Sequence, residues 1–115
     1  GGTRTASITG AWVALHYALS KLVKDGQLDQ VPLKDSVGAV SCGIFQGVAT
    51  LDLDYTEDSN ADADTNYVLT GSGGIVEIQG TAEKKPFSRE LLDELLDLAY
   101  RGIEELTKLQ KNALL

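Results

Sequence analysis

The sequence predicts a two-layer α+β fold in the order helix, four-stranded antiparallel meander, helix. Two apolar stripes with helical spacing lie near the two ends of the 115 residues, and short strand-like segments with glycine-rich turns lie between them. The hydrophobic fraction of 43 % is high enough for a core and excludes a disordered tail. We therefore expect residues 1–115 to form a single unit.

The first helix is predicted over residues 5–24. Thr3 is the expected N-cap, because its hydroxyl can accept a hydrogen bond from a backbone N–H of the first turn. Gly26 fits the left-handed position after the last turn. The apolar stripe of this helix recurs every three or four residues and consists of Ile8, Trp12, Leu15, Leu19 and Leu22.

Four short strands are predicted in the middle of the chain, over residues 36–45, 48–55, 65–70 and 75–79. Gln46 and Gly47 form a tight hairpin turn in which glycine supplies a positive φ. The second strand alternates, with Asp52 and Asp54 on one face and the apolar Leu51, Leu53 and Tyr55 on the other. Residues 57–64 break the alternation and are expected to form a loop.

The last helix is predicted to begin after Ser88, a favourable N-cap, with Phe87 and Leu92 forming a hydrophobic staple. Its apolar stripe consists of Leu92, Leu95, Leu96, Ala99, Ile103 and Leu106. We expect the two helices to cover one face of the sheet, while the face with Asp52 and Asp54 is open to water or to a partner.

Charge and composition exclude several classes of protein. The net charge of −7 opposes binding to nucleic acid or membrane by this chain alone, since phosphate groups would be repelled. No apolar run reaches membrane-spanning length. The single cysteine, Cys42, cannot form an internal disulfide and is expected in the core of a cytoplasmic protein. One Cys and one His, His16, do not make a zinc site, and His16 is interpreted as structural.

An acidic stretch over residues 51–66 contains no Lys or Arg, and its carboxylates belong to Asp52, Asp54, Glu57, Asp58, Asp62 and Asp64. The alternating oxygen ligands resemble the start of an EF-hand, but Ala63 and Leu69 stand where that loop needs Gly and Glu. Two interpretations remain open from the residues. The stretch is either a solvated loop or a site at which two or three carboxylates share one Mg²⁺ with water, as in phosphoryl transfer.

The segment Gly2-Thr3-Arg4 precedes the first helix and is suited to an anion. Backbone N–H groups and the helix dipole favour negative charge there, and Arg4 offers a planar fork for phosphate. A phosphate site and a carboxylate site in one small domain indicate phosphoryl or nucleotidyl transfer.

Three separated segments, GGTRTASITG at 1–10, LDLDYTEDS at 51–59 and VEIQGTAE at 76–83, resemble the C-terminal half of bacterial ribonuclease PH. The resemblance extends over all 115 residues in order. It implies the C-terminal half of a ribonuclease PH-type (ribosomal protein S5 domain 2-like) fold, with the N-terminal half absent from this chain.

The resemblance also implies an activity. Members of the family are phosphate-dependent 3′→5′ exoribonucleases, or tRNA nucleotidyltransferases, in which inorganic phosphate releases nucleoside 5′-diphosphates from RNA 3′ ends during tRNA and rRNA processing. They assemble as ring-shaped hexamers, trimers of dimers. The implied partners are RNA, phosphate, further copies of the enzyme and its N-terminal half, and the 115 residues alone are expected to be inactive.

The resemblance implies site residues as well. Phosphate would bind at Gly2, Thr3 and Arg4. Asp58 and Asp64 would be the catalytic residues and would hold Mg²⁺ or Mn²⁺, with Asp62 as a further metal ligand. The alternative is a non-catalytic structural or RNA-binding subunit of an exosome-like ring. Such subunits tend to lose the aspartate pair or the phosphate segment, and both are present here.

Overall fold

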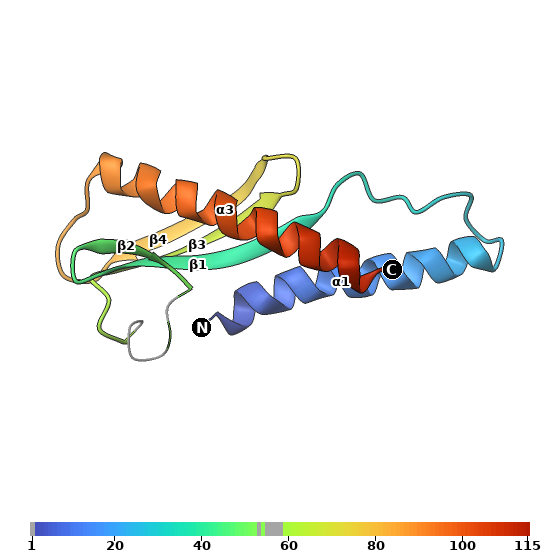
Figure 1. Ribbon diagram of the computed structural model, residues 1–115, viewed down its shortest axis with the longest axis horizontal. Helices are drawn as coiled ribbons and strands as arrows, with labels where there is room; N and C mark the ends of the chain where they lie inside the picture. Colours follow the sequence, from blue (N-terminus) through green and yellow to red (C-terminus); the bar gives the residue numbers. More distant parts are fainter. Residues whose placement is uncertain (1, 53, 55–58) are drawn as a thin grey trace.

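The computed structural model describes residues 2–52, 54 and 59–115 of the chain (Figure 1). Its elements are α1 (Thr3–Lys24), β1 (Val37–Phe45), β2 (Val48–Leu51), β3 (Ala63–Thr70), β4 (Ile75–Ala82) and α3 (Arg89–Ala113). Neither α1 nor α3 is long and apolar enough to cross a membrane.

The α+β class and the four-stranded antiparallel sheet are confirmed. The strand order is β2-β1-β3-β4, so the predicted meander is wrong where the chain passes from β2 to β3 on the other side of β1.

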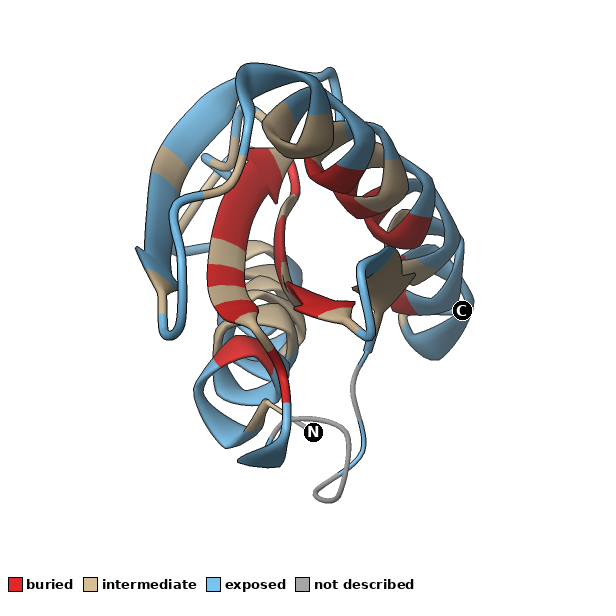
Figure 2. Ribbon diagram, turned by 90° about the vertical axis from the view of Figure 1, so that its left-hand side faces the viewer, coloured by how far each residue is buried: buried red, intermediate tan, exposed pale blue. Residues whose placement is uncertain are grey.

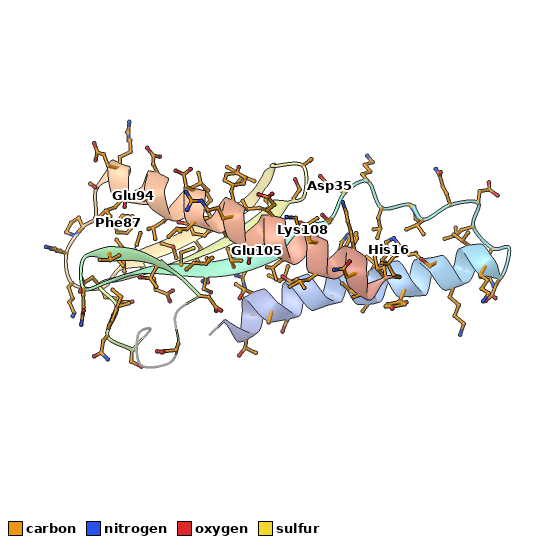
Figure 3. All side chains as sticks on the ribbon, viewed as in Figure 1. His16, Asp35, Phe87, Glu94, Glu105 and Lys108 are labelled. Carbon is orange, nitrogen blue, oxygen red and sulfur yellow. The ribbon has the colours of Figure 1, made fainter. Side chains whose placement is uncertain are left out.

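Helix α3 covers one face of the sheet and forms the core with it. Ser88 is its N-cap, as predicted, and its hydroxyl accepts a hydrogen bond from the Leu91 N–H at 3.1 Å. Phe87 is partly buried against the core, at the end of the sheet where α3 begins (Figure 3). Figure 2 shows the buried parts of the sheet and of α3 facing each other. The buried core cluster consists of Cys42, Ile44, Ala63, Tyr67, Leu69, Leu95, Ala99 and Ile103.

Helix α1 does not share that face, which corrects the expectation of two helices on one side. In Figure 1 it lies below β1 and extends beyond the sheet. Strand β2 pairs only with residues 42–45 of β1, and among the described residues no strand lies beside the first half of that edge. The Thr9 hydroxyl takes this place: it accepts from the Ala39 N–H at 3.0 Å and donates to the Ala39 carbonyl at 3.4 Å. One threonine thus replaces part of a strand ladder.

The ends of α1 differ from each other in how well the sequence predicted them. Gly26 has a φ of 81° after the last turn, as expected. At the start, the N-cap is Gly2 and not Thr3, and none of the described side chains caps the helix. Gly2 has φ 70° and ψ 61°, a left-handed conformation that glycine adopts without steric cost. Thr3 is already helical, and the hydroxyl of Thr5 donates to the Gly2 carbonyl at 2.8 Å.

Strand β2 is shorter and β3 longer than predicted. Gln46 and Gly47 form the expected turn with φ values of 53° and 78°. The predicted strand over residues 48–55 ends at Leu51, because Asp52 has a φ of 58°, which a strand cannot accommodate. Asp54 follows outside the strand, and Leu53, Tyr55 and Glu57 lie outside the described residues. Strand β3 begins at Ala63, so Asp64 lies in a strand and not in the predicted loop.

Replacing Thr9 by Val is expected to lower the free energy of unfolding by about 1–2 kcal/mol, since the Ala39 N–H would lose its partner at a partly buried edge. Ser7→Ala is the matched control, because the Ser7 hydroxyl donates to the Thr3 carbonyl of its own helix and not to the sheet. Urea denaturation of both variants measures the difference. Equal losses would show that the Thr9 contact does not hold α1 to the sheet.

Cys42 is buried in the core, as expected, and burial, with a smaller contribution from the charge of Asp52, raises the pKa of its thiol to about 12. Only the thiolate reacts with alkylating agents. Because a pKa of about 12 leaves very little thiolate at pH 8, iodoacetamide is expected to modify the folded protein about 10³-fold more slowly than the unfolded protein. Mass spectrometry with and without urea measures both rates. Similar rates would mean that this part of the core opens readily.

Candidate active site

The face of the sheet opposite α3, here called the open face, carries most of the polar side chains of the sheet. Cys42 and Tyr67 point into the core, so their neighbours along each strand point the other way. The strand register aligns the open face in three rows across β1, β3 and β4: Gly43–Asp64–Thr81, Ser41–Asn66–Gln79 and Ala39–Val68–Glu77. Within the central row the Ser41 hydroxyl donates to the Asn66 side-chain oxygen at 2.6 Å.

The start of α1 lies beside this central row. A Cβ atom on Gly2 would come within 3.1 Å of the Ser41 Oγ and 2.3 Å of the Thr5 Oγ1, so close approach as well as φ requires glycine here. From Gly2 the helix passes Ala39 at Thr9 and reaches the Asp35 carbonyl at Trp12. The helix therefore runs toward the beginning of β1. Its N-terminus, with the positive end of the dipole, faces the other way, toward the row of Asp64.

Arg4 extends from α1 over the open face. Its Nη2 donates to Glu77 Oε1 at 2.7 Å, and the two side chains are 53 % and 42 % exposed. Because α1 contacts β1 while Glu77 is on β4, the Arg4 side chain crosses β3 to reach it. Two predicted elements of the site, the phosphate segment and the strand of Asp64, therefore lie on the same face of the sheet.

Asp64 lines a hollow of about 390 Å³ at the end of the open face, together with Ser59, Ala61, Glu83 and Lys84. The lining offers two carboxylates, Asp64 and Glu83, and the Ser59 hydroxyl, which are the hard oxygen donors that a divalent cation prefers. Lys84, in the same lining, is a cation and does not bind metal ions as these oxygens do.

The carboxylates of the predicted metal site do not all stand in one place. Asp62 lies one residue before β3 and forms an ion pair with Lys84, with the Asp62 oxygen 3.3 Å from the Lys84 Nζ. Asp58 lies outside the described residues. Within residues 2–52, 54 and 59–115, no group of three His, Cys, Asp or Glu side chains is arranged to hold a metal ion. The predicted set of three contains Asp58 and remains a prediction.

Several residues of this face had no recognisable signal in the sequence. Ser41 and Asn66 are 25 residues apart and meet only through the β1–β3 register. Glu77 and Gln79 share a face by alternation, which the sequence indicates, but the partner of Glu77 is 73 residues away. His16 is remote from this face and lies beside Trp12, with ring centroids 5.3 Å apart (Figure 3).

The fold and this face define a class of protein. Residues 35–102 match the model of the 3′ exoribonuclease family, domain 2, and the chain belongs to this family. It is 63 % identical over 114 residues to ribonuclease PH of Rhodospirillum rubrum, a match that covers 99 % of this chain and 48 % of that protein. The predicted resemblance to ribonuclease PH is confirmed, and the chain spans about half the length of that relative.

Solved structures share the fold at lower identity. Rice (Oryza sativa) Rrp46 superposes with a TM-score of 0.63 and 19 % identity, over 88 % of this chain and 46 % of that one. The Archaeoglobus fulgidus exosome with RNA bound to its active site gives a TM-score of 0.58 and 20 % identity, over 75 % of this chain and 35 % of that one. At these identities the likeness shows the fold.

Proposed function

We propose that this chain is the C-terminal half of a phosphate-dependent 3′→5′ exoribonuclease that trims tRNA precursors and rRNA and releases nucleoside 5′-diphosphates. One observation carries the proposal. The start of α1 with Arg4, suited to an anion, and Asp64, suited to a hard cation, belong to one face of one sheet. Family membership and the 63 % identity to a ribonuclease PH support it.

The residues divide the work of the reaction between them. Inorganic phosphate would bind at the backbone N–H groups of Gly2 and Thr3 and at the Arg4 guanidinium, which together offset its charge. One phosphate oxygen forms a bond to the terminal phosphorus of the RNA, and the bond from that phosphorus to the 3′-oxygen of the preceding nucleotide breaks. The products are a nucleoside 5′-diphosphate and an RNA one nucleotide shorter, whose new 3′-oxygen takes a proton.

Asp64 is the described residue that we assign to the metal, together with Asp58 and with Asp62 as a further ligand. Mg²⁺ or Mn²⁺ bound there would offset negative charge on the scissile phosphodiester and on the leaving oxygen. Since the phosphate is already anionic near neutral pH, positioning and charge compensation account for most of the catalysis.

The acidic chain needs partners to attract RNA. Its net charge of −7 opposes an RNA strand, so the basic contacts would come from the N-terminal half and from other subunits of a homohexamer. We place this assembly in the cytoplasm, in keeping with the single buried cysteine.

The test is phosphorolysis by the full-length protein, using an RNA with a tRNA-like 3′ extension with and without inorganic phosphate. We expect nucleoside diphosphates to appear only when phosphate is present. Release of nucleoside monophosphates without phosphate would indicate hydrolysis and contradict the proposal. Binding of the RNA without any shortening would favour the non-catalytic ring subunit.

A further inference from the structure

The contact with Glu77 places the Arg4 guanidinium away from the row of Asp64, where the proposed reaction needs it. The row of Glu77 and the row of Asp64 are four residues apart along β3, from Asp64 to Val68, which is about 13 Å. Gly2 lies beside the central row, between the two. The Arg4 guanidinium is therefore held at the row of Glu77 and not at the row that carries Asp64.

The Arg4 side chain extends across the sheet, from α1 beside β1 to Glu77 on β4. Side chains on an α-helix lean toward its N-terminus, which here faces the row of Asp64. Arg4 instead crosses β3 toward the row of Glu77, in which Val68 is only 6 % exposed. A charged partner accounts for this direction, since Glu77 accepts the short hydrogen bond at 2.7 Å.

The ion pair is built so that it can be exchanged. Both side chains are about half exposed, and exposed ion pairs are weak because water and salt screen them. A carboxylate and a phosphate also present the same kind of anionic oxygen to a guanidinium. An incoming phosphate therefore competes with Glu77 for Arg4 on equal chemical terms.

We propose that Glu77 is a positioning residue that holds Arg4 away from the Asp64 end of the open face until inorganic phosphate displaces it. The Glu77 carboxylate then sets the affinity for phosphate, because each binding event must first break the Arg4–Glu77 pair. This inference rests on the proposed phosphate site and adds the residue that competes with the ligand there.

The test compares phosphate affinity in the full-length protein and in Glu77→Gln, which keeps the shape of the side chain and removes its charge. Titration with inorganic phosphate in the absence of RNA is expected to give a dissociation constant about two- to fivefold lower in the variant, the range of an exposed ion pair. The KM for phosphate is expected to fall by the same factor, while kcat changes less than twofold. An unchanged or weaker affinity would overturn the proposal.

Two further variants separate competition from a general effect of charge. Glu104→Gln makes the same charge change on the exposed side of α3, where Glu104 faces Lys108, and is expected to leave phosphate affinity unchanged. In an Arg4→Gln background, Glu77→Gln is expected to have no further effect, since the competing pair no longer exists. A gain in phosphate affinity that persists in that background would overturn the inference and indicate a general electrostatic effect of the lost charge.

The binding titration also keeps this inference distinct from the proposed function. If phosphate binds and Glu77→Gln binds it more tightly, the inference holds even when no RNA is shortened. If RNA is phosphorolysed but Glu77→Gln binds phosphate no better, the inference fails and the proposed function stands. Absence of phosphate binding in the wild-type protein would overturn the inference directly.

Discussion

Asp64→Asn is expected to lower kcat for phosphorolysis by the full-length enzyme about 10³-fold or more. A divalent cation that neutralises charge at a phosphoryl centre is worth several kcal/mol, and each 1.36 kcal/mol corresponds to a factor of ten in rate. The Asn side chain has the same shape but cannot provide the anionic oxygen. Nucleoside diphosphate release at saturating phosphate and RNA measures the effect.

The matched control is Asp93→Asn, which makes the same change on the exposed side of α3 and is expected to keep full activity. Asp64 lies on the edge of a solvent-accessible hollow and not in the core, so circular dichroism of Asp64→Asn is expected to match that of the wild type. Normal turnover by Asp64→Asn would contradict its assignment to the metal. Asp62→Asn tests whether Asp62 is a second metal ligand or only the ion-pair partner of Lys84. A strong fall in kcat is expected only if Asp62 is a ligand.

Leu95→Ala is expected to lower the free energy of unfolding by about 3 kcal/mol, within the range for deleting a fully buried leucine side chain. Leu95 is 0 % exposed and lies in the cluster that joins α3 to β1 and β3. The loss combines the hydrophobic transfer of the removed atoms with the cavity that they leave. Urea denaturation followed by circular dichroism gives the difference.

Leu109→Ala provides the comparison on the same helix, since Leu109 is 62 % exposed. Its effect is expected to stay within about 0.5 kcal/mol, as for most surface substitutions. Similar losses in the two variants would mean that α3 does not pack on the sheet through the face that contains Leu95.

Local chemistry predicted some features well and others poorly. The Ser88 cap and the Gln46-Gly47 turn depend on neighbouring residues, so their signals lie within a few positions of the sequence. Thr3 has the same capping chemistry as Ser88, but the N-cap of α1 is Gly2, because the chain there must approach Ser41 closely. Asp52 reads as a strand residue by alternation, yet its positive φ ends β2.

The candidate site also combines features that residue types indicated with contacts that they did not. Residue types alone indicated an anion site at Gly2-Thr3-Arg4 and a possible cation site near Asp64, and the resemblance to ribonuclease PH joined them into one enzyme. Nothing in the sequence paired Arg4 with Glu77 or Asp62 with Lys84. Asp64 was expected in a loop, because the acidic residues before it are typical of a loop, whereas β3 already begins at Ala63.

The sequence by itself determined the α+β class, the number and order of the described helices and strands, and the family to which the chain belongs, because periodicity, turns and motifs are local properties of the chain. The tertiary structure decided that β1 lies between β2 and β3, and that α1 occupies the edge of β1 through Thr9. It also decided that Arg4 meets Glu77 on the open face. These features depend on strand register and on contacts between residues far apart in the chain, and no local pattern encodes either one.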